Sequence, residues 1–218
     1  SMDAGPMPSC QVTVQWNSGG GWQTPYRADP LGGEIWSSPF IAARIGQATV
    51  AWLRNLGGFA ELWAARCNTG GCPGVQSLKL FYMNPEHMNL DGPRDIDVQV
   101  NDVGDALLLF AEKDAGVFMS HATGPSGPFT APTKLADLPA DRPVAAARTG
   151  SNQFAAAWRD GATVVVAWLT AQTTSDNVAA ISISGGASNI SDLRIGSVGN
   201  AVLAVWVADG NVWGVWAK

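Results

Sequence analysis

One short pattern occurs four times in this chain of 218 residues, and it constrains the fold more than any other feature. Each copy begins with a polar residue, continues through small or aliphatic residues and ends on a large aromatic residue. The copies occupy residues 47–52, 105–110, 153–158 and 200–206. They recur about every 50 residues, and a fixed period of roughly 20–50 residues indicates a solenoid, a propeller or another repeat array.

The unit at 141–188 shows what one repeat contains. Four runs typical of strands fit within it, and the turn Asp160-Gly161 separates the second run from the third. Asp-Gly between two such runs favours a tight β-hairpin, because both turn residues need positive φ. Four antiparallel strands in about 50 residues are typical of one β-propeller blade. We therefore predict an all-β protein, a β-propeller of four-stranded antiparallel blades.

The aromatic residue that ends each copy is expected to pack between adjacent blades. A large ring can fill the wedge between two sheets, and the small residues before it suit strands that crowd toward the propeller axis. We therefore assign these four aromatics to the core and not to a ligand site. They are Trp52, Phe110, Trp158 and Trp206.

We predict one domain, residues 1–218, with four blades. The blade units are approximately 36–90, 91–140, 141–188 and 189–218, the last of which lacks a fourth strand. The N-terminal strand within 10–28 is expected to supply that strand and so close the ring, which would remove exposed sheet edges. Because 10–28 has room for two strands, a five-bladed ring and a ring shared between two chains remain alternatives.

The charge content excludes some classes of partner. Charged residues make up 14% of the chain, against about 25% in ordinary globular proteins. The net charge is −5, and no cluster of Lys or Arg is present, so we expect no nucleic-acid binding. No apolar run approaches the roughly 18 residues of a membrane-spanning helix. We therefore expect no membrane span.

Two of the three cysteines lie close together, with a glycine-rich loop between them. We predict that Cys67 and Cys72 form a disulfide across the end of a hairpin, with free thiols as the alternative. A metal site is the weaker interpretation, because two thiolates need two more ligands and the only histidines are His87 and His121. A disulfide would indicate a secreted or periplasmic protein whose signal peptide has been removed. Cys10 is left without an assigned role.

The repeat resembles the blades of bacterial secreted β-propeller proteins, and it is similar to sialidase-like and glycoside-hydrolase-like propellers. Gly199-Asn200-Ala201 leading to Trp206, and Gly104-Asp105-Ala106 leading to Phe110, carry the resemblance. It spans most of residues 36–218 and implies a fold. The Asp-box of sialidases, Ser-x-Asp-x-Gly-x-x-Trp, is absent, so the resemblance does not imply sialidase activity.

Three arginines recur as Arg-x-Gly after the predicted first strands. They are Arg44, Arg148 and Arg194. If first strands line the propeller axis, these guanidiniums could cluster at one end of the channel and bind a carboxylate or phosphate, in a way that resembles the arginine triad of sialidases. The alternative is a repeated structural contact with a carbonyl or carboxylate of the neighbouring blade.

Asp95 and Asp97 alternate on one face of a predicted first strand. Paired carboxylates can hydrolyse a glycosidic bond, although no clear partner across the channel is evident. With Asp91 they could also bind Ca²⁺, but the spacing of an EF-hand is missing. A solvated or turn-capping role is the alternative. We predict no cofactor and no metal site.

The function that we predict is a non-enzymatic binding module for a glycan or a protein partner. Trp22 and Trp36 lie outside the repeated aromatic positions, so they are candidate exposed platforms for a ligand. Two alternatives stay open: a propeller glycoside hydrolase acting at the axial channel, and a structural or assembly protein. We expect a monomer or a homodimer.

Overall fold

In the part of the chain that the structure describes, every regular element is a β-strand. The structure is a computed structural model, and it describes residues 12–17, 21–28, 39–44, 46–55, 59–84, 89–90, 93–112, 115–137, 143–150, 153–174, 178–184 and 190–218. These residues include no helix with the length and hydropathy that crossing a membrane requires.

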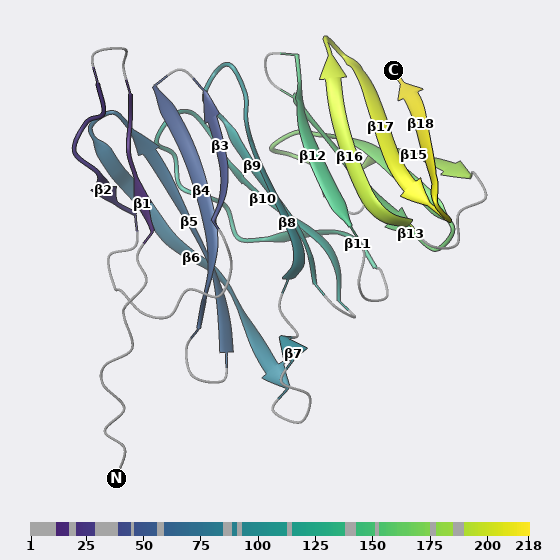
Figure 1. Cartoon of the computed structure of the whole chain (residues 1–218), viewed down its shortest axis with the longest axis horizontal. Coiled ribbons are helices and arrows are strands. Elements are labelled where there is room, and N and C mark those ends of the chain that lie inside the picture. Colours follow the sequence, from purple (N-terminus) through teal and green to yellow (C-terminus); the bar gives the residue numbers. More distant parts are fainter. Residues whose placement is uncertain are drawn as a thin grey trace.

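The strands form five antiparallel sheets, and each sheet is built from consecutive strands (Figure 1). The N-terminal sheet pairs β1 (Thr13–Val14) with β2 (Tyr26–Arg27). The second sheet has the order β3 (Phe40–Arg44), β4 (Gln47–Asn55), β5 (Phe59–Asn68), β6 (Gly71–Asn84) and β7 (Asn89–Leu90). The third sheet contains β8 (Pro93–Val100), β9 (Ala106–Glu112), β10 (Gly116–Ala122) and β11 (Thr133–Ala136).

The last two sheets repeat the same plan. The fourth sheet has the order β12 (Val144–Thr149), β13 (Gln153–Asp160), β14 (Thr163–Leu169) and β15 (Ala179–Ser184). The fifth sheet contains β16 (Ile190–Val198), β17 (Ala201–Ala208) and β18 (Asn211–Ala217). The predicted four-stranded antiparallel blades are therefore confirmed, and two sheets consist of four consecutive strands paired in chain order.

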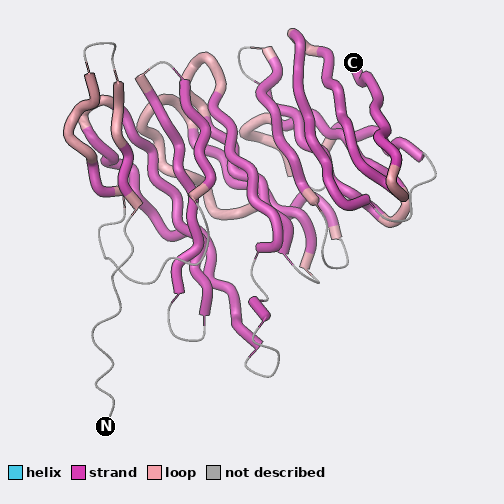
Figure 2. The backbone as a smooth tube through the Cα atoms, viewed as in Figure 1, coloured by secondary structure: helices cyan, strands magenta, loops and turns pink. Residues whose placement is uncertain are grey.

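The sheets stack face to face in chain order along the long axis of the molecule (Figures 1 and 2). We call the side that a sheet turns to the following sheet its forward face, and the opposite side its backward face. The first strands β3, β8, β12 and β16 are neighbours in space, although each belongs to a different sheet. The stack thus brings four strands far apart in the sequence to one side of the molecule.

The second strand of a sheet that lies between two other sheets is buried on both faces. In β9, Leu107 and Leu109 contact the fourth sheet, whereas Leu108 and Phe110 contact the second sheet. All four side chains are buried. Successive side chains of a strand point to opposite faces, so a strand between two sheets needs an uninterrupted apolar run. This is why the repeated pattern contains no charged residue between its first position and its aromatic, and why Thr49 is its one hydroxyl-bearing side chain there.

The four repeated aromatics all lie on backward faces, where they pack against the preceding sheet. Trp52 belongs to the core shared with the N-terminal sheet, Phe110 to the core shared with the second, Trp158 to that shared with the third, and Trp206 to that shared with the fourth. Each is at most 4% exposed. The prediction that they fill the space between blades is confirmed.

Closure of the ring by the N-terminal strand is not confirmed. The segment forms two strands that pair with each other, and Val12 and Val14 pack against the backward face of the second sheet. Hydrogen bonds from Ala28 N to Val12 O and from Gln23 N to Trp16 O complete this small sheet. It lies at the opposite end of the stack from β18 (Figure 1), and β16–β18 is three-stranded among the described residues. The apolar alternation of Val12 and Val14 suits a sheet of its own, and not an added edge strand.

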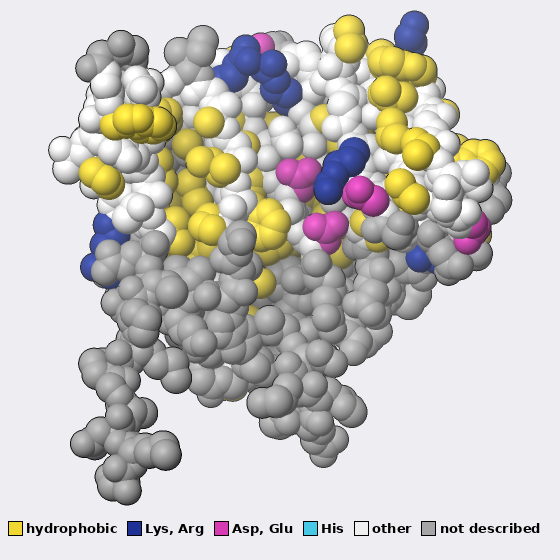
Figure 3. Space-filling model, in the orientation of Figure 1, with side chains coloured by type: hydrophobic (Ala, Val, Ile, Leu, Met, Phe, Trp, Pro, Cys, Tyr) yellow, Lys and Arg dark blue, Asp and Glu magenta, His cyan; other side chains and the backbone are white. Residues whose placement is uncertain are grey.

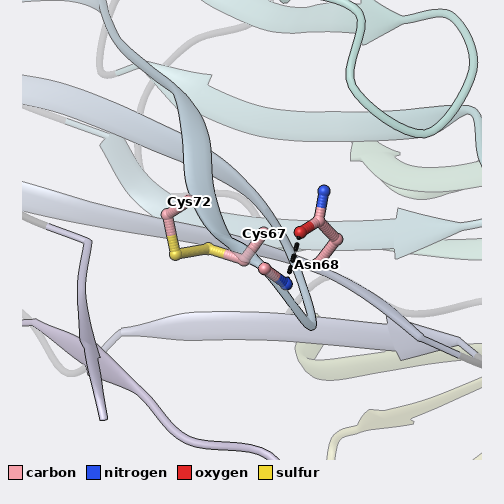
Figure 4. The surroundings of a disulfide bond; sticks show 4 residues. Cys67, Asn68 and Cys72 are labelled. Atoms are coloured by element: carbon pink, nitrogen blue, oxygen red, sulfur yellow. Dashed lines mark hydrogen bonds between the residues drawn. A yellow bond between two sulfur atoms is a disulfide. The ribbon is translucent and has the colours of Figure 1, made fainter. Parts of the chain in front are cut away.

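Cys67 and Cys72 are joined by a disulfide at the turn between β5 and β6 (Figure 4). The Asn68 side chain accepts a hydrogen bond from Gly70 N at 2.7 Å within the same turn. Tyr26 of the N-terminal sheet donates its hydroxyl hydrogen to the Thr69 carbonyl at 3.1 Å. The disulfide and these bonds fix the hairpin and attach the N-terminal sheet to it.

Two glycines with positive φ provide a matched test of this backbone. A Cβ on Gly116 (φ +127°) would lie 2.1 Å from the Ala136 carbonyl oxygen, whereas a Cβ on Gly161 (φ +58°) meets nothing within 4 Å. We expect Gly161→Ala to cost about 1 kcal/mol, from backbone strain alone. Gly116→Ala adds a clash with backbone and should cost roughly 3 kcal/mol or more. Urea unfolding measures both variants, and equal losses would contradict the close approach of β10 to β11.

Candidate functional site

The neighbouring first strands form a polar, hollowed surface. One hollow of about 290 Å³ is lined by residues 41–44 of β3, residues 97–100 of β8 and Arg148 of β12. A second of about 250 Å³ is lined by Asp102, Arg148, Gly150, Ser197 and Gly199. Arg148 borders both hollows, and we call the two together the first-strand groove. Figure 3 shows acidic and basic side chains gathered over the middle of this face.

Two arginines share one carboxylate in the groove. Nη2 of Arg44 and Nη1 of Arg148 both bind Oδ1 of Asp102. The three side chains are 37–44% exposed. A guanidinium carries five N–H donors in a rigid fork, so each arginine keeps donors that Asp102 does not occupy. The trio has a net charge of +1 and offers both donors and an acceptor to a ligand.

The trio arises from one repeated backbone position. Each first strand is followed by a glycine with positive φ, and the residue two positions before that glycine points into the groove region. The glycines are Gly46, Gly104, Gly150 and Gly199, with φ of +71°, +87°, +55° and +59°. The residues at the repeated position are Arg44, Asp102, Arg148 and Ser197. Arg, Asp and Arg on three successive blades therefore meet as a bridged pair of cations.

The turn that carries Asp102 is held rigidly from both sides. Asn101 Oδ1 accepts hydrogen bonds from Val103 N and Asp105 N, at 3.1 and 2.8 Å. The buried Arg66 of β5 donates Nη2 to the carbonyls of Gly104 and Gly124. These contacts place Asp102 before any ligand arrives.

The structure separates Arg194 from the other two arginines. Gly196 lies within β16 and pairs with Leu203, so Arg194-x-Gly196 is not equivalent to the two other Arg-x-Gly motifs. Ser197 occupies the equivalent position, and its hydroxyl donates to the Arg148 carbonyl. Arg194 instead forms an ion pair with Asp192, at 3.3 Å. The motif misled because it ignores where the hairpin turns, which only the pairing of β16 with β17 reveals.

Asp95 and Asp97 tie β8 to β12. Asp95 Oδ2 accepts a hydrogen bond from Val144 N at 3.0 Å, and Asp97 Oδ2 accepts one from Ala146 N at 2.7 Å. The strands belong to different sheets, so no backbone ladder joins them and these N–H groups need another acceptor. The two carboxylates provide it, and they set the spacing of the strands that line the groove.

Burial raises the pKa of both aspartates above the ordinary value. Desolvation disfavours the charged form of each carboxyl, and the backbone N–H groups oppose this effect. The positive charge of Arg194 also lowers the pKa of both, as the smallest of these effects.

The predicted aromatic platforms lie elsewhere or cannot be placed. Trp22 belongs to the N-terminal sheet, forms a bridge with Asn17, and is 69% exposed. Trp36, like Asp91 and Cys10, lies outside the described residues. Among the residues whose placement is described, no three His, Cys, Asp or Glu side chains are grouped so as to hold a metal ion.

Comparison with known proteins identifies the fold. No protein-family model matches the chain, and a search of curated proteins gives no match either. Among solved structures, the chain is similar to the Aleuria aurantia lectin N224Q mutant in complex with α-methyl-L-fucoside, with a TM-score of 0.51 and 14% identity. That alignment covers 96% of this chain and 76% of the lectin.

Two further structures are similar to the chain. The same lectin mutant in complex with Fucα1-6GlcNAc gives a TM-score of 0.50 at 14% identity, over 96% of this chain and 77% of that one. A GH43_1 enzyme from Xanthomonas citri gives 0.41 at 10% identity, over 84% of this chain and 68% of that one, and this value is too low to carry an argument. At such identities the likeness shows the fold alone, and the chain has a β-propeller fold.

The raised pKa values of Asp95 and Asp97 predict a pH dependence with a definite sign. Between the unfolded pKa, 3.8, and the raised folded pKa, the folded chain binds more protons than the unfolded chain. The contribution of the pair to the free energy of unfolding therefore falls as pH rises through that window. Urea unfolding at a series of pH values, for the wild type and for Asp95→Asn/Asp97→Asn, gives this contribution as a difference. If this contribution instead grew with pH, the hydrogen bonds from backbone N–H groups would lower the folded pKa of the pair more than burial raises it.

Asp102 should matter little for stability. Its ion pairs with Arg44 and Arg148 are more than one third exposed, and such pairs contribute roughly 0–1 kcal/mol. We expect Asp102→Asn to lower the free energy of unfolding by less than about 1 kcal/mol, as measured by thermal and urea unfolding. A loss several times larger would show that the bridge holds the third sheet between its neighbours.

Proposed function

We propose that this protein is a non-enzymatic binding module and that its ligand is a glycan held in the first-strand groove. The observation that carries the proposal is the lining of the larger hollow, where Arg44, Asp97, Gln99 and Arg148 converge from three sheets. Binding sites for small ligands combine a hollow with a few fixed polar groups, and this surface has both.

The chemistry of the lining suits hydroxyl-rich ligands. A sugar hydroxyl both donates and accepts, so it is matched by guanidinium donors beside carboxylate and amide acceptors. Gln99 donates Nε2 to Asp97 Oδ1 at 3.2 Å, which leaves its amide oxygen for a ligand. Ile41 lines the same hollow with 62% of its side chain exposed, and it offers an apolar contact for the carbon skeleton of a sugar ring.

The size of the groove limits what it holds. Pockets for drug-sized ligands are roughly 300–1,000 Å³, and each hollow here is somewhat smaller. Because Arg148 borders both, a disaccharide could contact the two hollows at once, with the rest of a longer glycan in solvent. The similar lectin is a glycan-bound propeller in both of its complexes. Its similarity gives the fold, whereas the proposed ligand class rests on the groove.

Trp22 and Trp36 are candidates for a second, separate platform that the groove site does not require. The indole of Trp22 is 69% exposed on the N-terminal sheet, so its ring is accessible for stacking. The Cys67–Cys72 disulfide is compatible with an extracellular location, where such ligands occur.

A glycoside hydrolase is the second candidate, and the raised pKa values of Asp95 and Asp97 favour it. Hydrolysis needs carboxyls on opposite sides of the scissile bond, however, and these two lie on one face of one strand. Both oxygens of each also accept backbone N–H groups. Turnover of chromogenic glycosides that Asp97→Asn abolishes would favour the hydrolase over the binding module.

A glycan array that includes α-fucosides, followed by calorimetric titration of the best binder, tests the proposal. We expect Gln99→Ala and Arg148→Ala each to weaken binding about tenfold or more, because each removes a hydrogen bond to the ligand worth at least about 1.4 kcal/mol. Arg27→Ala is the matched control, since Arg27 is an exposed arginine of the N-terminal sheet, and it should leave the affinity unchanged.

Two results would contradict the proposal. One is an array without any bound glycan. The other is a glycan whose affinity is unchanged in Gln99→Ala and Arg148→Ala, which would place its site outside the groove. A loss in Trp22→Ala alone would assign binding to the N-terminal sheet.

A further inference from the structure

Every forward face that has a following sheet is buried beneath it. The third sheet covers Leu62 and Ala64 of the second, and the fourth sheet covers Leu109 and Met119 of the third. The fifth sheet covers Val166 of the fourth. All of these side chains are at most 3% exposed. A forward face in this protein is thus an apolar surface shaped to pack against another sheet.

The forward face of the fifth sheet has the same character but lies open. Leu203, Val205 and Val207 of β17 alternate with the inward-facing residues and are only partly buried. Val212 and Trp216 of β18 pair with Val207 and Leu203, and they are 74% and 58% exposed. Figure 3 shows hydrophobic side chains gathered at this end of the molecule.

One internal comparison shows that this face is built for contact. Trp168 is the penultimate residue of β14, faces forward, and packs against the fifth sheet. Trp216 is the penultimate residue of β18 and also faces forward. The two tryptophans occupy corresponding places, yet only Trp168 has a sheet in front of it among the described residues.

The opposite end of the stack does not complement this face. The backward face of the N-terminal sheet presents the exposed polar residues Thr13, Gln15 and Arg27 around one exposed aromatic, Trp22. Packing Val212 and Trp216 against them would bury polar groups without partners, which costs free energy. Copies of this chain are therefore unsuited to head-to-tail stacking, and an apolar face on one copy matches the same face on another.

The charges on the face are also self-complementary. Asp192 and Arg194 of β16 lie opposite Val207 and Val205 on the forward side, and they are 54% and 78% exposed. The two side chains pair with each other within one chain, so a contact between two copies around a two-fold axis brings no net charge to the face. Two sheets packed face to face lie about 10 Å apart, as sheets within one chain do.

We propose that the fifth sheet is a homodimer interface, in which its forward face packs against the same face of a second copy around a two-fold axis. We call this surface the dimer face, and it comprises Leu203, Val205, Val207, Val212 and Trp216. The proposal continues the sheet-on-sheet packing of the stack across two chains. It is independent of the glycan site, which lies on the first strands.

Sedimentation velocity over a wide concentration range tests the dimer. We expect a species of twice the 22.8 kDa chain mass that dissociates on dilution. Trp216→Arg should raise the dimer dissociation constant at least about thirtyfold, as loss of a central aromatic anchor does. Trp22→Arg is the matched control: Trp22 is a tryptophan on the N-terminal sheet that is 69% exposed, against 58% for Trp216, and its replacement should leave the dimer intact.

Val212→Lys provides a second variant that is safe for folding, because Val212 is 74% exposed in the single chain. This variant should also dissociate the dimer. At concentrations where the wild type and Val212→Lys are both monomers, the two should have the same thermal unfolding midpoint. A wild type that stays monomeric at all concentrations would overturn the proposal. So would a dimer that neither variant weakens, dissociation by Trp22→Arg, or an open-ended series of larger oligomers. Retained glycan binding in monomeric Val212→Lys separates this proposal from the function of the groove.

Discussion

The burial of one strand between two sheets is the constraint on which the rest of the structure depends. Along β9 and along β13, successive side chains alternate between the two cores on either side of the strand. Both faces of the strand must therefore be apolar over the same few residues. Alanine dominates β13, and the buried Trp158 ends its apolar run. Two-sided burial thus fixes the order of the sheets and brings their first strands together.

The groove is a consequence of that stacking. Neighbouring first strands have no shared backbone ladder, so polar side chains must connect them. Asp95 and Asp97 do this on β8, and Asp102 connects Arg44 with Arg148 across three sheets. The same residues that hold the strands at a fixed spacing also supply the donors and acceptors of the groove, so the proposed site is rigid before a ligand binds.

The sequence predicted the features that depend on local pattern. Alternation and the Asp160-Gly161 turn gave the strands and hairpins, and the period located the buried aromatics. Features that depend on register were harder to predict. The Arg-x-Gly motif groups Arg194 with Arg44 and Arg148, whereas β16 runs three residues further before it turns at Gly199. Aligning the glycines of positive φ, instead of the arginines, would have pointed to Asp102 and Ser197. The pattern of the N-terminal segment predicts one strand of the last blade, because nothing local shows that its two strands pair with each other.

The position of the ligand is the most direct test of this account. Backbone amide shifts, followed by NMR during titration with the glycan that binds best, locate the site without any substitution. The account predicts that the shift changes centre on residues 41–44, 97–102 and 148, and that β17 and β18 are unaffected. Shift changes centred on the N-terminal sheet or on the fifth sheet, with none in the first strands, would contradict the claim that the stacked first strands form the binding site.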